Sequence, residues 1–327
     1  MFDTLSFSMN AVLPLVLLVV IGYVLRQKNF FTDDFLSTAN KFCFRFCFFS
    51  TMFVSIYNIQ SFDPKYADLV IFTIIALFSL IAIGVIYAMI FVKDPKQKGV
   101  MAQAFYRSNY AILGVPLVMN LFGENGVPCA AFVLACTIPI FNISAVILLS
   151  VFIKNENNKI SLVSIIKKIA QNPLIEGIAL GFVCQLLRPY LGGWTLKESN
   201  LRFVYRTIEN LSKITTPFAL IILGGQFKFS AARHLLPKIT VAVFFRLIFA
   251  PCAGLFAAHM FFPHFGGPEF AALLPLFGSP AAVASAIMAN QMHNDGELAT
   301  QIVVWTTLLS GITIFILIAV LRAIGIF

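Results

Sequence analysis

Two apolar stretches of the chain each carry a Gly-x-Pro sequence near the middle, Gly114-Val115-Pro116 and Gly278-Ser279-Pro280. Proline removes a backbone donor and disfavours helical geometry in the residue before it, and glycine accepts backbone angles that other residues avoid. In a membrane, backbone groups freed by such a break must face protein or a water-filled cavity. The pattern predicts two interrupted helices whose half-helix N-termini meet and bind an anion, in particular a carboxylate. The alternative is a cation held by the half-helix C-termini and the unwound carbonyls.

Polar side chains near these breaks are the candidate ligands. Asn109 and Tyr110 precede the first break, and Ser279 lies inside the second. Asn142 lies in the middle of the apolar stretch 125–153, which follows the stretch that contains the first break. Amide and hydroxyl groups can donate hydrogen bonds to a carboxylate. For Asn142 the alternative is a hydrogen bond to a neighbouring helix, and for Tyr110 it is packing alone.

Two arginines lie inside apolar stretches, where a charge marks a candidate functional site. Arg107 precedes Pro116 by about two helical turns and is a candidate guide for the anion. Arg246 is a candidate for the site or, alternatively, for holding the carbonyls of a helix C-terminus. No carboxylate falls clearly in the middle of a span, and the four histidines fall at span ends. Cation exchange, which usually needs an acid at the midplane, is therefore disfavoured.

The composition excludes most other classes of protein. Of the 327 residues, 59% are hydrophobic and 11% are charged, against about 25% charged in a typical soluble domain. The formal net charge of +9 comes mainly from Lys and Arg in short gaps between apolar runs, which indicates membrane topology and not nucleic-acid binding. The six cysteines lie in or beside apolar runs without histidine partners, so no metal site is expected. The sequence also contains no Gly-rich phosphate-binding loop of the GxxxxGK[ST] kind and no evident Ser/His/Asp set for nucleophilic catalysis. We therefore expect no enzymatic activity and no cofactor.

The elements that must position the two breaks are long apolar helices. We predict ten membrane spans, because about 20 residues cross the hydrocarbon core. Their ranges are 4–25, 34–58, 69–92, 98–122, 125–153, 171–190, 204–227, 235–262, 268–292 and 298–321. Lys and Arg are more numerous on one side, which predicts a multi-pass protein of the cell membrane with both termini outside.

The chain also contains an internal repeat. Pro14 and Gly22 recur with the same spacing as Pro173 and Gly181, 159 residues later, and the Gly-x-Pro sequence recurs after 164 residues. Five spans per copy is an odd number, so the second copy would be inverted, as in many transporters. The predicted organisation is a first repeat at 1–153, a short cytoplasmic linker at 154–170 and a second repeat at 171–327.

Several short motifs, taken in order, resemble the auxin efflux carrier family in its bacterial branch. They are Arg107-Ser-Asn109 with Gly114-Val-Pro116, Asn172-Pro173-Leu, Arg246-Leu with Pro251, and Ser279-Pro280-Ala. The resemblance implies two inverted five-helix repeats with crossed breaks in spans 4 and 9. It also implies a scaffold domain from spans 1, 2, 6 and 7, often dimeric, and a moving transport domain from the rest.

The same resemblance implies a substrate class. Family members carry organic anions, with malate or malonate as substrates of bacterial relatives. We therefore predict a carrier of small carboxylates that works by elevator-like alternating access, coupled to Na⁺ or H⁺ or uncoupled. Two alternatives remain open: a sodium-coupled symporter related to bile-acid carriers, and a membrane sensor that does not transport.

Overall fold

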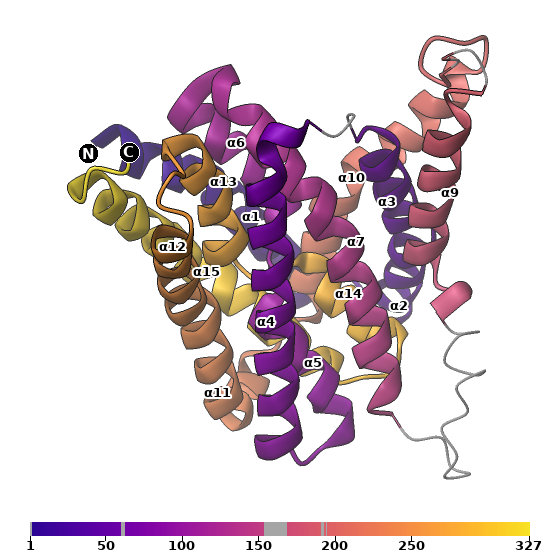
Figure 1. Ribbon diagram of the computed structural model, residues 1–327. Coiled ribbons are helices and arrows are strands. Elements are labelled where there is room, and N and C mark those ends of the chain that lie inside the picture. The colour runs from indigo at the N-terminus through magenta and orange to yellow at the C-terminus, as the bar shows by residue number, and fades with distance from the viewer. Residues whose placement is uncertain (1, 60–62, 154–168, 191–192, 194) are drawn as a thin grey trace.

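The computed structural model describes residues 2–59, 63–153, 169–190, 193 and 195–327, and these residues form helices with short connections (Figure 1). The helices of the first half are α1 (Phe2–Gln27), α2 (Asp33–Phe42), α3 (Phe48–Tyr57), α4 (Ala67–Phe91), α5 (Pro95–Tyr106), α6 (Tyr110–Phe122) and α7 (Val127–Val151). Those of the second half are α9 (Pro173–Leu187), α10 (Arg202–Gln226), α11 (Phe229–Phe244), α12 (Ala250–Phe261), α13 (Gly267–Gly278), α14 (Val283–Gln291) and α15 (Gly296–Ala323). The all-helical prediction is confirmed. The predicted linker lies outside the described residues, apart from its last two.

The surface of the bundle is suited to lipid. Four helical stretches of the described chain are long and apolar enough to cross a membrane, namely Pro64–Phe91, Tyr110–Val151, Phe229–Phe261 and Gly296–Ala323. Large apolar side chains such as Ile90, Leu186 and Phe256 point outward and are about two-thirds exposed. Soluble proteins rarely expose contiguous apolar patches of this kind. The architecture is that of a polytopic membrane protein.

Side-chain caps fix where several helices begin. The side chain of Asp94 accepts a hydrogen bond from the Lys96 amide, at 2.9 Å, directly before α5. Asn172 does the same before α9, and Asp295 accepts from the Leu298 amide at the start of α15. The first amide groups of a helix lack partners within it, so these short polar side chains favour helix initiation at the loops.

Two of the long helical rods contain a wide, π-helical turn. One, η1 (Cys43–Cys47), joins α2 to α3, and the other, η4 (Phe245–Phe249), joins α11 to α12. Two further rods are interrupted, between α5 and α6 and between α13 and α14. In Figure 1, α2, α3 and α9 lie to the right, α11, α12 and α13 to the left, and α5 and α14 between them. The interrupted rod of α13 and α14 is buried from Phe270 to Gly278 and from Val283 to Ala289.

Glycines at the repeated positions allow two helix pairs to pack closely. A Cβ atom added to Gly22 of α1 would lie 2.0 Å from the carbonyl oxygen of Ile221 in α10, and one added to Gly181 of α9 would lie 2.8 Å from the Cβ atom of Ile56 in α3. Both distances are shorter than real contacts, so neither position accepts a side chain without a shift of its neighbour. Small residues let helix backbones approach in membranes.

Substitution of Gly22 by alanine is expected to destabilise the protein by about 1–3 kcal/mol, because the new methyl group would meet the Ile221 backbone. Thermal unfolding of the purified protein measures the effect. Gly311→Ala is the matched control, since its added Cβ atom would lie 3.6 Å from the nearest atom, an ordinary contact. Equal melting temperatures for the two variants would contradict the close α1–α10 contact.

Candidate substrate site at the crossing of two interrupted helices

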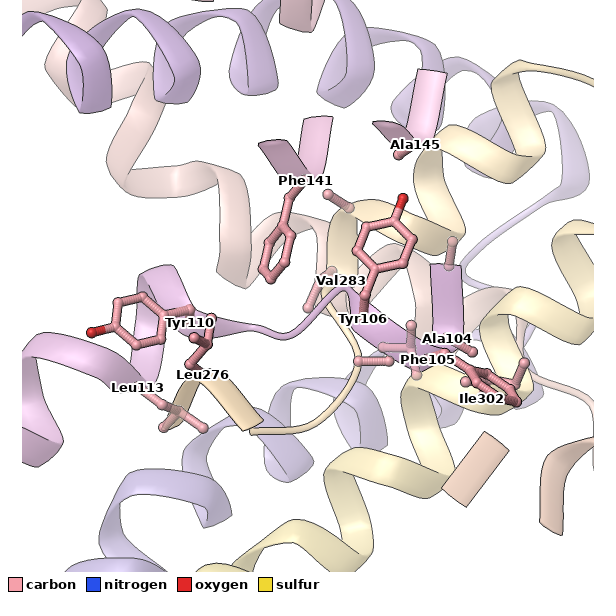
Figure 2. Packing of buried hydrophobic residues seen from close by; sticks show 14 of the residues in the cluster. Ala104, Phe105, Tyr106, Tyr110, Leu113, Phe141, Ala145, Leu276, Val283 and Ile302 are labelled. Carbon is pink, nitrogen blue, oxygen red and sulfur yellow. The ribbon is translucent and has the colours of Figure 1, made fainter. Parts of the chain in front are cut away.

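The two interruptions cross and pair through their backbones. The Asn109 amide donates to the carbonyl oxygen of Pro280 at 2.8 Å, and the Ala282 amide donates to that of Arg107 at 3.0 Å. Ser108 and Ala281 form the centre of this short antiparallel pair. The segment 107–109 between α5 and α6 is the first link, and the segment 279–282 between α13 and α14 is the second. Figure 2 shows Tyr106 and Tyr110 at the two ends of the first link, with Val283 of α14 beside it. Each link thus provides hydrogen-bond partners for the backbone groups of the other.

The position of the first break differs from the prediction. The sequence pattern placed it at Gly114-Val115-Pro116, but α6 runs without interruption from Tyr110 to Phe122 with Pro116 inside it. The break lies instead at residues 107–109. The backbone leaves helical geometry there because Arg107 and Asn109 form hydrogen bonds with the second interrupted segment, which a continuous helix could not form. The second break agrees with the prediction. Gly278 ends α13, and Ser279 is extended, with φ −67° and ψ 152°, before Pro280.

Arg246 binds the C-terminal ends of both half-helices that enter the crossing. From η4, its guanidinium donates to the carbonyls of Tyr106, at 3.2 Å, and Phe105, at 3.4 Å, which end α5. It also donates to the Leu276 carbonyl of α13 and, at 2.9 Å, to that of Ser279. A cation at a helix C-terminus stabilises the negative end of the helix dipole. The fully buried Arg246 side chain therefore fills the place between these ends.

The first amide groups of α6 and α14, at the crossing, have no acceptor within their own helices. The Asn109 and Ala282 amides are used in the backbone pairing, and those of Ile112 and Ser285 bond back to the residues three before them. The amides between them have no acceptor within their own helices; these are Tyr110, Ala111, Val283 and Ala284. Each helix N-terminus carries about half a positive charge, so the pair favours an anion.

Four polar side-chain atoms around the crossing have no hydrogen-bond partner among the described residues. They are Ser108 Oγ, Asn109 Nδ2, Ser279 Oγ and Ser285 Oγ, all in side chains more than nine-tenths buried. A buried polar group without a partner is costly, so a cluster of them indicates a ligand or ordered water. The sequence pattern named Asn109 and Ser279. It missed Ser108 and Ser285, whose only available signal was closeness to a break.

Arg107 and Asn142 bind one another instead of facing the crossing as separate ligands. The Arg107 guanidinium donates to Asn142 Oδ1 at 2.7 Å and to Gln103 Oε1 at 3.0 Å, and it contacts Met288 Sδ at 2.9 Å. The Asn142 amide group donates to the Ile138 carbonyl and contacts Met52 Sδ. Both side chains are buried. In this conformation Asn142 holds the Arg107 side chain, while the backbone carbonyl of Arg107 pairs with the Ala282 amide at the crossing.

The remaining candidates near the first break have packing contacts. Tyr110 is buried, and its hydroxyl group donates to the Ala130 carbonyl of α7 at 3.2 Å, away from the first link (Figure 2). A Cβ atom on Gly114 would lie 2.7 Å from the Tyr110 ring, so Gly114 makes room for that ring. Val115 and Pro116 lie on α6, beyond its first turn.

Comparison with known proteins identifies the family of the chain. The model of the Mem_trans family, described as membrane transport protein, matches residues 7–318. The chain belongs to this family. It is the family of the auxin efflux carriers, so the resemblance stated from the motifs is confirmed. An archaeal relative, an uncharacterized transporter of Methanothermobacter thermautotrophicus, is 24% identical over 311 residues, which cover 94% of this chain and 96% of the relative. The chain is therefore a membrane transporter by family.

Proposed function

We propose that the chain carries small carboxylates across the membrane and binds them at the crossing of the two interrupted helices. The observation that carries this proposal is the asymmetry of the crossing. Arg246 occupies the C-terminal ends of α5 and α13. The first amides of α6 and α14 have no acceptor within their own helices, and they lie next to the side chains of Asn109 and Ser285, which have no hydrogen-bond partner among the described residues. Donors without acceptors suit a carboxylate, whose oxygens only accept.

The same asymmetry weakens the alternative of a sodium ion at the break. Such an ion needs several carbonyl oxygens, and four of those nearest the crossing already accept from Arg246. A guanidinium group at this place would also repel the cation. We therefore propose a carboxylate site with no sodium ion between the half-helix C-termini. The transport assay described below tests whether Na⁺ bound elsewhere is coupled to uptake.

The proposed mechanism is an elevator-like movement of one group of helices past the other. The scaffold would comprise α1, α2, α3, α9 and α10, and the transport domain would comprise α4–α7 and α11–α15, as two inverted repeats of five spans. Polar contacts join the two groups at the end of α14. Gln291 donates to Asn40 Oδ1 at 3.1 Å, and Asn290 donates to Gln226 Oε1 at 3.2 Å. Side-chain amides of this kind can exchange partners during sliding at low cost.

The proposed setting is the cell membrane with both termini outside and a homodimer formed through the scaffold. Apolar side chains of α9, including Val183 and Leu186, are exposed and would pack against lipid or the second copy. The substrate and the bilayer are the other expected partners.

Uptake by reconstituted protein tests the proposal. We expect proteoliposomes to accumulate labelled malate or malonate down an imposed gradient, and unlabelled carboxylates to compete while amines and neutral sugars do not. Repeating the assay without sodium separates the coupled symporter from the other mechanisms. Folded protein that moves cations or neutral solutes but no carboxylate would contradict the proposal. Carboxylate binding without flux would favour the sensor.

A further inference from the structure

The two wide turns of the bundle each carry an arginine, and the two arginines have opposite surroundings. Arg246, in η4, is fully buried and donates to four backbone carbonyls. Arg45 is the central residue of η1, and its side chain is exposed. The described residues offer it neither a hydrogen bond nor an ion pair. π-helical turns inside α-helices are frequent at functional sites, and a charge within a span marks such a site.

Arg45 lines a polar cavity between the proposed scaffold helices and the end of α14. The cavity has a volume of about 640 Å³, and its polar lining side chains are Lys41, Arg45, Gln171, Glu176 and Gln291. Lys41, in α2, and Arg45, in η1, lie about one helical turn apart. Gln171 directly precedes the N-cap residue of α9, and Glu176 lies in the first turn of α9. Gln291 is the last residue of α14.

The charges and donors of this cavity favour an anion. Two cationic groups face one carboxylate, Glu176, and no ion pair joins them in the described part of the chain. Gln171 and Gln291 add amide donors. The neighbouring cavity, which shares Gln291, differs in this respect, since its Arg26 and Lys228 are balanced by Asp33 and Glu297 and Arg26 pairs with Asp33 at 2.6 Å.

The helix α14 connects this cavity to the crossing. Ser285, in the first turn of α14, belongs to the crossing, and Gln291 ends the same helix in the cavity. Because α14 has nine residues, its two ends are only about 13 Å apart. Met288 lies between them and contacts Arg107. Because a methionine side chain is flexible and unbranched, it can make way for a passing solute.

From these observations we infer that Lys41 and Arg45 form a second, peripheral anion site that receives the carboxylate before it reaches the crossing. The inference rests on the proposed function. Lys41 and Arg45 attract the anion into the cavity and raise its local concentration next to α14, since a cleft lined by one sign of charge concentrates counter-ions. These residues do not bind the substrate at the crossing itself, so they act on its capture and not on its translocation.

Uptake kinetics give the first test. In proteoliposomes, Arg45→Gln and Lys41→Gln are expected to raise KM for the carboxylate by about three- to tenfold at low salt while leaving kcat unchanged. The difference from wild type is expected to shrink at about 1 M salt, where the Debye length is only about 3 Å. Arg45→Lys is expected to restore the low KM. The matched control is Lys213→Gln, which removes a scaffold charge that pairs with Glu209 outside the cavity. An unchanged KM in both cavity variants would overturn the inference.

Thiol labelling gives a second test that needs no transport. In Gln171→Cys protein, a negatively charged methanethiosulfonate reagent is expected to react about three- to tenfold faster than a positively charged one, relative to a free thiol. Adding Arg45→Gln should abolish this preference, and the chain without the new cysteine measures the background from exposed Cys252. Labelling without charge preference would overturn the anion site. Retained preference in protein that moves no carboxylate would instead contradict the proposed function.

Discussion

Replacement of Asn109 by alanine is expected to reduce carboxylate uptake by about 10–100-fold without loss of folded protein. A hydrogen bond to a charged group contributes about 1.5–3 kcal/mol, and each 1.4 kcal/mol corresponds to about tenfold. The fold should tolerate the change, because Asn109 Nδ2 has no partner among the described residues and the side chain makes no capping hydrogen bond at the start of α6. Its backbone amide, which pairs with Pro280, is kept in the variant.

The measurement is initial uptake of labelled malate or malonate, together with the melting temperature of the same preparation. Asn120→Ala is the matched control, since it removes the same amide group from an exposed position at the other end of α6. Stabilisation by the carboxylate, seen as a raised melting temperature in wild type, should vanish only in Asn109→Ala. Full uptake by Asn109→Ala would remove the crossing from the substrate pathway.

The sequence predicts the helical architecture well because its signals are local. Apolar runs place most helices within a few residues of where the structure has them, as with the predicted span 69–92 for α4 and the predicted span 204–227 for α10. The repeated Gly22 and Gly181 are also correctly singled out. Each lies at a close approach of two helices, where an added Cβ atom would meet the neighbouring helix.

The exact break and its ligands depend on distant contacts that the sequence does not display. Pro116 predicts a kink by local chemistry, yet the chain leaves helical geometry at residues 107–109 because Pro280 and Ala282 supply backbone partners there. The choice between a carboxylate and a cation likewise depends on Arg246, more than a hundred residues from the carbonyls of α5. Ser285 has no signal in the sequence beyond its closeness to the second break, because it is the crossing that leaves its hydroxyl group buried and without a partner among the described residues.

Replacement of Arg246 by methionine is expected to destabilise the whole crossing. The substitution keeps an unbranched apolar stem but removes every donor from the carbonyls of Phe105, Tyr106, Leu276 and Ser279. Each buried polar group left without a partner costs about 1–3 kcal/mol. Loss of the cation's own desolvation cost offsets part of this total. We expect a net loss of at least about 3 kcal/mol, which corresponds to a melting temperature lower by about 5 °C or more.

The melting temperature in detergent measures this effect, and two further variants separate its causes. Arg246→Lys keeps the charge next to the two helix C-termini but cannot reach four carbonyls at once, so its stability should fall between those of wild type and Arg246→Met. Arg45→Gln removes the arginine of the other wide turn, which makes no hydrogen bond to the described residues, and should melt like wild type. If Arg246→Met melted like Arg45→Gln, the guanidinium would not hold the half-helix ends together. Those carbonyls would then be free to bind a cation, and the argument for a carboxylate over sodium at the crossing would lose its basis.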